Sequence, residues 1–196
     1  SLDSKVAAIV ASCDLASPDA VSKLQELQQK CPQVKGIRWI LDCVGPFEPD
    51  TATHVATLRH DGIDYLRGSQ GGYDGQTVPA FEKGFALLTD HGFSFDLQCA
   101  PVQLPEAAKL CARHPDVPVV IDHMGKPRML IKADDEPVGD GISNSNTSPN
   151  VNQEELEAWR SGMKAMAAIP HAHVKLSMLG YAVPGWQRTS GRMQFL

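Results

Sequence analysis

Short runs of strand-forming residues alternate with helical patterns along the chain, and this alternation constrains the fold more than any other feature of the sequence. Five such runs have the length of typical strands: 6–12, 36–42, 94–99, 117–122 and 173–178. Strands that alternate with helices predict a parallel sheet. That sheet is either open and doubly wound or part of a (β/α)8 barrel.

Four helices are predicted from the spacing of apolar residues and from residues that start and stop helices. The expected ranges are 18–31, 81–91, 105–114 and 153–169. Pro18 suits the first helical position, Gly92 suits a helix end, and Asn152 with Glu155 three residues later resembles a capping box.

The whole chain, residues 1–196, is expected to form one domain, because no shift in composition divides it. Residues 68–75 contain four glycines and are predicted to form a loop. Residues 128–151, rich in Asp, Gly, Ser and Asn, are predicted to form a long loop or insertion.

Charge, the length of apolar runs and cysteine spacing indicate which partners and which compartment to expect. The net charge of −5 comes from 23 acidic and 18 basic residues spread along the chain, so we expect no nucleic-acid partner. No apolar run approaches the roughly 20 residues of a membrane helix, so we expect no membrane partner. The five cysteines lie singly, which favours a reducing compartment and a cytoplasmic location.

Polar residues recur on one face of the predicted strands. Residue alternation places six of them there: Arg38, Asp42, Asp96, Gln98, Lys175 and Ser177. A doubly wound sheet has apolar helices on both faces and cannot hold these groups at mid-strand. A barrel interior that opens towards a site can hold them, so the alternation favours the barrel. In the alternative interpretation they form structural ion pairs, Arg38 with Asp42 or Lys175 with Asp96.

The segment 121–127, Ile-Asp-His-Met-Gly-Lys-Pro, places an acid and a histidine directly after a buried strand. Ligands of α/β proteins bind at the carboxyl ends of strands, where a histidine can act as a metal ligand or a general base. His123 is therefore a candidate functional residue. The alternation of residues is compatible with Asp122 on either face of the sheet. His171 and His173 precede or open a strand and are expected to be structural.

The segments 35–38, 81–88, 95–98, 120–127 and 174–177 together resemble the amidohydrolase superfamily. The likeness is to its sugar-lactonase-like branch of TIM-barrel metal-dependent hydrolases. It implies an incomplete TIM barrel in which the five strands are the second to sixth of eight. The family's H-x-H would then precede Ser1 and its late Asp would follow Leu196, since a full barrel needs about 250 residues.

The resemblance implies a hydrolase that opens a lactone of a sugar acid, or a related carboxylated ring ester, with an activated water. His123 and Gln98 would then be catalytic, and the small anionic substrate would be bound by four residues: Arg38, Lys175, Ser177 and Asp122. Either one divalent metal such as zinc, with His123 as a ligand, or no metal would be needed.

Two other functions stay open. A chain without the H-x-H and the late Asp could be an inactive binding or scaffold protein. The same superfamily also contains decarboxylases. The sequence does not determine the oligomeric state.

Overall fold

The computed structural model describes residues 6–43, 63–68, 76–127, 130 and 151–178. Except for residues 130 and 151, the predicted loop or insertion at 128–151 lies outside these residues, as does the glycine-rich loop at 68–75 except for residue 68. No helix of the described part is long and apolar enough to cross a membrane.

The sheet has five parallel strands in the order β1-β2-β3-β4-β5. The strands are β1 (Ile9–Ser12), β2 (Val34–Ile40), β3 (Ser94–Gln98), β4 (Val119–Ile121) and β5 (Ala172–Val174). A doubly wound sheet reverses its strand order at one point, whereas each strand here pairs with the next along the chain. The arrangement is therefore an arc of a (β/α)8 barrel, as predicted from the polar face of the strands.

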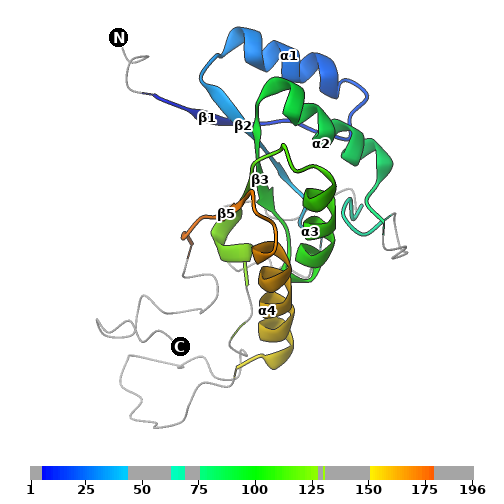
Figure 1. Cartoon of the computed structure of the whole chain (residues 1–196), viewed down its shortest axis with the longest axis vertical. Helices are drawn as coiled ribbons and strands as arrows, with labels where there is room; N and C mark the ends of the chain where they lie inside the picture. Colours follow the sequence, from blue (N-terminus) through cyan, green and yellow to red (C-terminus); the bar gives the residue numbers. More distant parts are fainter. Residues whose placement is uncertain (1–5, 44–62, 69–75, 128–129, 131–150, 179–196) are drawn as a thin grey trace, which may run out of the picture.

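Four α-helices form the second layer: α1 (Ala20–Lys30), α2 (Pro79–His91), α3 (Leu104–Arg113) and α4 (Gln153–Ala167). Right-handed crossovers between strands that advance in one direction place successive helices on one face of the sheet. Figure 1 shows the helices along one side of the strands, and α1 packs against α2 while α3 packs against α4.

The core lies between the sheet and the helices. Ile37, Phe95 and Val119 point into it from neighbouring strands and are each at most 1% exposed. Phe81 and Phe85 of α2 meet them from the helix layer, with the Phe85 and Phe95 ring centroids 5.2 Å apart. Apolar side chains of the strands face the helices, so their polar side chains face the barrel interior.

The elements differ from the expected ranges mainly at their ends. β1 begins at Ile9 and β5 ends at Val174, so Lys175 and Ser177 follow the last strand and do not lie within it. Alternation with Lys175 and Ser177 would place Val174 and Leu176 on the apolar side, yet they are 44% and 80% exposed because β5 is the outer strand of the described sheet.

The helix starts show how local chemistry sets the boundaries. The Asn152 side chain accepts a hydrogen bond from the Glu155 amide at 3.3 Å, which confirms the predicted cap of α4. α1 begins at Ala20 and not at Pro18, because residues 14–19 form a turn in which the Ser17 carbonyl accepts from the Ala20 amide. Gly84 allows α2 to approach the chain before α1, since a Cβ there would lie 1.9 Å from the Leu15 carbonyl oxygen.

Candidate active site

Polar side chains from four strands meet at the carboxyl edge of the sheet. Arg38 of β2 pairs in register with Asp96 of β3, and Gln98 ends β3. Asp122 and His123 follow β4 directly, and Lys175 follows β5. The carboxyl ends of parallel strands are where α/β proteins bind ligands, so these residues form the candidate active site.

Asp122 is at the centre of this cluster. Its Oδ1 accepts a hydrogen bond from Lys175 Nζ at 2.9 Å, and its Oδ2 lies 3.7 Å from Arg38 Nη1. Lys175 also donates to Asp96 Oδ2. Both carboxylates are buried, whereas the Arg38 and Lys175 side chains are 46% and 41% exposed. Asp122 therefore faces the barrel interior, and the two cations project towards solvent where a ligand can meet them.

Lys175 keeps its charge in this environment. Partial burial by itself would lower the pKa of the Lys175 ammonium, but the hydrogen bonds to Asp96 and Asp122 outweigh it and raise that pKa above its ordinary value. The cluster of Arg38, Lys175, Asp96 and Asp122 thus contains two positive and two negative charges. Of the two cations, Arg38 has the looser contact with its carboxylate and is the freer one to bind an anion.

His123 lies beside this charged cluster. Its Nδ1 is 2.9 Å from Ser177 Oγ, and within the described residues Nε2 has no hydrogen-bond partner. Burial lowers the pKa of the His123 imidazole, Asp122 opposes this effect, and Lys126, Arg38 and Lys175 reinforce it. The ring is therefore neutral at pH 7. A neutral ring whose Nδ1 is occupied can present Nε2 to a ligand as a donor or as an acceptor.

The backbone that carries His123 is left-handed. The φ angles of His123, Met124, Gly125 and Lys126 are 54°, 55°, 73° and 53°. Each non-glycine residue in this conformation costs about 1–2 kcal/mol. Such strain persists only where the surroundings fix the backbone, and it is found most often at functional sites.

A buried ion pair lies beneath this turn. Lys126 Nζ is 3.2 Å from Asp42 Oδ2, with side chains 2% and 0% exposed. Lys126 was not predicted from the sequence as the partner of Asp42. The available signal was a lysine placed directly after a strand-end turn, together with an inward-facing Asp42 that needed a cation.

One of the two ion pairs proposed from alternation is correct. Lys175 contacts Asp96 as expected. The pairing of Arg38 with Asp42 is wrong, because Arg38 lies beside Asp122 and Asp42 contacts Lys126. Structural ion pairs and a polar site therefore occupy the same face of the sheet.

Gln98 has unsatisfied hydrogen-bonding capacity. The residue is 1% exposed, and neither its Oε1 nor its Nε2 has a hydrogen-bond partner among the residues that the structure describes. A buried amide without partners costs free energy that a bound ligand or an enclosed water can recover. Gln98 thus offers the N–H donors of Nε2 and the acceptor Oε1 beside the Asp122 cluster.

The described residues do not fit a divalent metal. No group of three His, Cys, Asp or Glu side chains in this part of the chain is arranged to hold one. His123 is the candidate ligand, but Asp122 beside it already contacts Arg38 and Lys175, whose charges oppose a further cation. His173 lies on β5 opposite Val120, and His171 precedes that strand, away from its carboxyl end.

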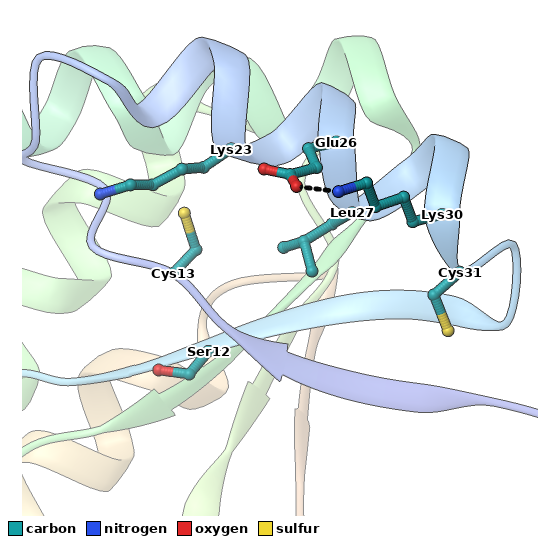
Figure 2. Close-up of a pocket in the computed structure, with 7 residues that line it drawn as sticks. All are labelled: Ser12, Cys13, Lys23, Glu26, Leu27, Lys30 and Cys31. Atoms are coloured by element: carbon teal, nitrogen blue, oxygen red, sulfur yellow. Dashed lines mark hydrogen bonds and ion pairs between the residues drawn. The ribbon is translucent and has the colours of Figure 1, made fainter.

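A separate hollow of about 320 Å³ lies between α1 and β1 (Figure 2). Lys23, Glu26 and Lys30 line it from α1, together with Cys13 and Cys31. Burial raises the pKa of the Cys13 thiol, and Glu26 is hydrogen-bonded to Lys30 at 2.5 Å. The Cys13 thiol is therefore not an activated nucleophile, and the candidate chemistry stays at the strand ends.

Comparison with known proteins relates the chain to one family. The amidohydrolase family model matches residues 33–192. An L-fucono-1,5-lactonase of Burkholderia ambifaria is 30% identical over 174 residues, which is 89% of this chain and 43% of the relative. An L-fucono-1,5-lactonase of Burkholderia multivorans is 30% identical over 99 residues, which is 50% of this chain and 28% of the relative. The chain thus spans less than half the length of these curated relatives.

Solved structures show the same fold. Two crystal structures of an amidohydrolase from Burkholderia multivorans, one with bound zinc and one with bound HEPES, superpose with TM-scores of 0.61 and 0.59. Both are 24% identical to this chain. The match to the zinc-bound structure covers 95% of this chain and 49% of that structure. The match to the HEPES-bound structure covers 93% of this chain and 48% of that structure.

Proposed function

The chain belongs to the amidohydrolase family, and we propose that it forms part of a hydrolase that opens the lactone of a sugar acid or a related carboxylated ring ester. The observation that carries the proposal is the convergence of His123, Gln98 and the Arg38–Lys175 cation pair at the carboxyl ends of neighbouring strands. The lactonases among the relatives support this choice of reaction.

In this proposal the two exposed cations bind the substrate's negative charge, with Arg38 making the main contact. Asp122 holds Arg38 and Lys175 on either side of one carboxylate and so sets the distance between them. Ser177 fixes the His123 ring through Nδ1. Asp122 and Ser177 therefore contribute to substrate binding by orienting the groups that contact the ligand.

His123 and Gln98 orient and polarise the lactone carbonyl. When the Ser177 hydroxyl donates to Nδ1, the neutral ring carries its proton on Nε2 and can donate it to the carbonyl oxygen. The Gln98 amide can donate a second hydrogen bond from Nε2. Donors aimed at the oxygen that becomes negative stabilise the transition state more than the ground state.

The reaction consumes one water. The water oxygen bonds to the carbonyl carbon, the bond between that carbon and the ring oxygen breaks, and the product is a hydroxy acid. The acid releases one proton at neutral pH, which a pH indicator detects. No step is assigned to a metal, because the described residues do not form a metal site.

The test is proton release from carboxylated sugar-acid lactones by the native protein that contains this sequence. Replacing His123 with Ala is expected to lower kcat/KM by about 100-fold or more, because it removes a donor to the developing oxyanion. His91→Ala is the matched control, since His91 ends α2 and bonds to Gln28 of α1.

Two outcomes would reject the proposal. A His123→Ala variant as fast as the wild type would remove the role assigned to this residue. A wild-type protein that hydrolyses no sugar-acid lactone would reject the function itself and favour a binding or scaffold role for the chain.

A further inference from the structure

We propose that Trp159 of α4 is a positioning residue that holds the left-handed turn 123–126 and thereby the direction of the His123 ring. The chemical consequence for His123 depends on the proposed function, whereas the positioning itself can be tested without any reaction. Trp159 lies in a different element from the turn, so the link is a tertiary contact and not a local one.

The backbone on both sides of Met124 is tethered. The Met124 amide donates to the Lys175 carbonyl at 3.0 Å, and the Met124 carbonyl accepts from Trp159 Nε1 at 2.7 Å. The two peptide planes next to Met124 are therefore fixed from opposite elements. Lys175 holds the plane that joins His123 to Met124, and Trp159 holds the plane that joins Met124 to Gly125. Release of the second plane would let Met124 rotate, and that rotation would reach the imidazole through the first plane.

The helix layer also limits how far the turn can move. A Cβ on Gly125 would lie 2.7 Å from Met163 Sδ and 3.0 Å from Leu104 Cδ1. Met163 follows Trp159 by one turn of the same helix. α4 thus contacts the turn by close packing and by the indole hydrogen bond.

These contacts hold the turn in a backbone conformation that its own residues disfavour. His123 and Met124 both favour negative φ, so a turn released from its tethers would relax towards the right-handed or extended regions. The hydrogen bond from Trp159 depends on a single side-chain N–H that lies outside the turn and outside the charged cluster, so one substitution removes it. Its removal should let the His123 ring sample other directions.

The matched change is Trp159→Phe, which keeps an aromatic ring on α4 and removes the N–H donor. A second variant carries benzothienylalanine at position 159, which keeps the bicyclic shape of tryptophan and lacks the N–H. Gln28→Ala serves as the control, because it removes another side-chain tether between elements, from Gln28 Nε2 to the His91 carbonyl.

Two measurements on the native protein separate positioning from mere packing. Imidazole ¹⁵N resonances of selectively labelled His123 report the tautomer and the Ser177 contact without substrate. Steady-state kinetics with a sugar-acid lactone report kcat and KM separately. In both Trp159 variants we expect shifted His123 resonances and a kcat lower by about 10- to 100-fold at unchanged KM.

The outcomes distinguish this inference from the proposed function. Shifted His123 resonances in a protein without lactone hydrolysis would support the positioning role and reject the function. Unchanged resonances in both Trp159 variants would overturn the positioning role, whatever the activity. An equal response in Gln28→Ala would overturn it as well, because the effect would then reflect general loosening of the fold.

Discussion

Asp42 and Lys126 form an ion pair with almost no access to water, and such a pair is sensitive to the loss of either partner. Burying two charges is offset only when they contact each other and further hydrogen-bonding groups. Both residues make further polar interactions besides their mutual contact at 3.2 Å. The pair therefore anchors the His123 turn to the end of β2.

Replacing Lys126 with Met is expected to destabilise the protein by about 3–5 kcal/mol, because the Asp42 carboxylate stays buried without its ammonium partner. The measurement is the urea midpoint of unfolding. Lys30→Met is the control: it removes the pair with Glu26, in which the side chains are 75% and 57% exposed, and should leave the urea midpoint almost unchanged because solvent screens such a pair. Equal losses in the two variants would contradict the anchoring role of Lys126.

At this scale the sequence predicted which face of the sheet the polar residues occupy better than it predicted their ion-pair partners. Alternation placed Arg38, Asp96 and Lys175 on the inner face, because the period of a strand is fixed. It could not say that Arg38 contacts Asp122 and not Asp42, because the partner depends on how the chain turns after β4. The left-handed turn was unpredictable for the same reason, since tertiary contacts impose it on residues that do not prefer it.

Between elements, α2 and α3 are joined by Glu82. Arg113 donates to both carboxylate oxygens, at 2.7 and 2.9 Å, and His114 Nε2 lies 3.1 Å from Oε1. Chiefly because of the hydrogen bonds from Arg113, the pKa of the Glu82 carboxyl lies below its ordinary value of 4.5. The linked residues bring the start of α2 and the end of α3 together over the core.

This pKa predicts a pH dependence with a definite sign. A carboxyl group with a lower pKa in the folded state adds stability above the unfolded value of 4.5, and this stability is lost as the pH falls through the folded pKa. Glu82→Gln should therefore lower stability at pH 7 by about 1 kcal/mol or less and flatten its decline below pH 4.5. Urea unfolding between pH 7 and pH 3 measures this, with the exposed Glu157→Gln as control. A decline as steep as that of the wild type would contradict the contribution of Glu82.

The order of elements was predictable because each strand is an apolar run bounded by turn or cap residues. The central strands β2 and β3 were placed within two residues at each end. The outer strands were predicted too long, because a strand ends where its neighbour stops pairing, and no local pattern in β1 or β5 marks that point. Residues 123–126 were expected to form a turn after the strand, but no local signal predicts the left-handed φ of the non-glycine residues His123, Met124 and Lys126.

At the scale of the whole molecule, the two outer edges of the described sheet determine how the chain can associate. Within the described residues no strand pairs with the outer sides of β1 and β5 (Figure 1). Ile9 and Val10 of β1 are 37% and 46% exposed, and an apolar edge strand offers unpaired backbone groups to another strand. A stable protein must cover this edge, with another segment of its polypeptide or with a second molecule.

The 196-residue chain expressed by itself is therefore expected to associate through β1 as its concentration rises. Val10→Lys should reduce this association, because a charged side chain on an edge strand opposes pairing with a second strand. Val21→Lys is the matched control, since Val21 is 43% exposed on α1 and lies away from the edge. Sedimentation velocity at several concentrations measures the effect. If the two variants associate equally, the contact does not involve β1; if only Val10→Lys stays monomeric, the open edge limits what the isolated chain can do.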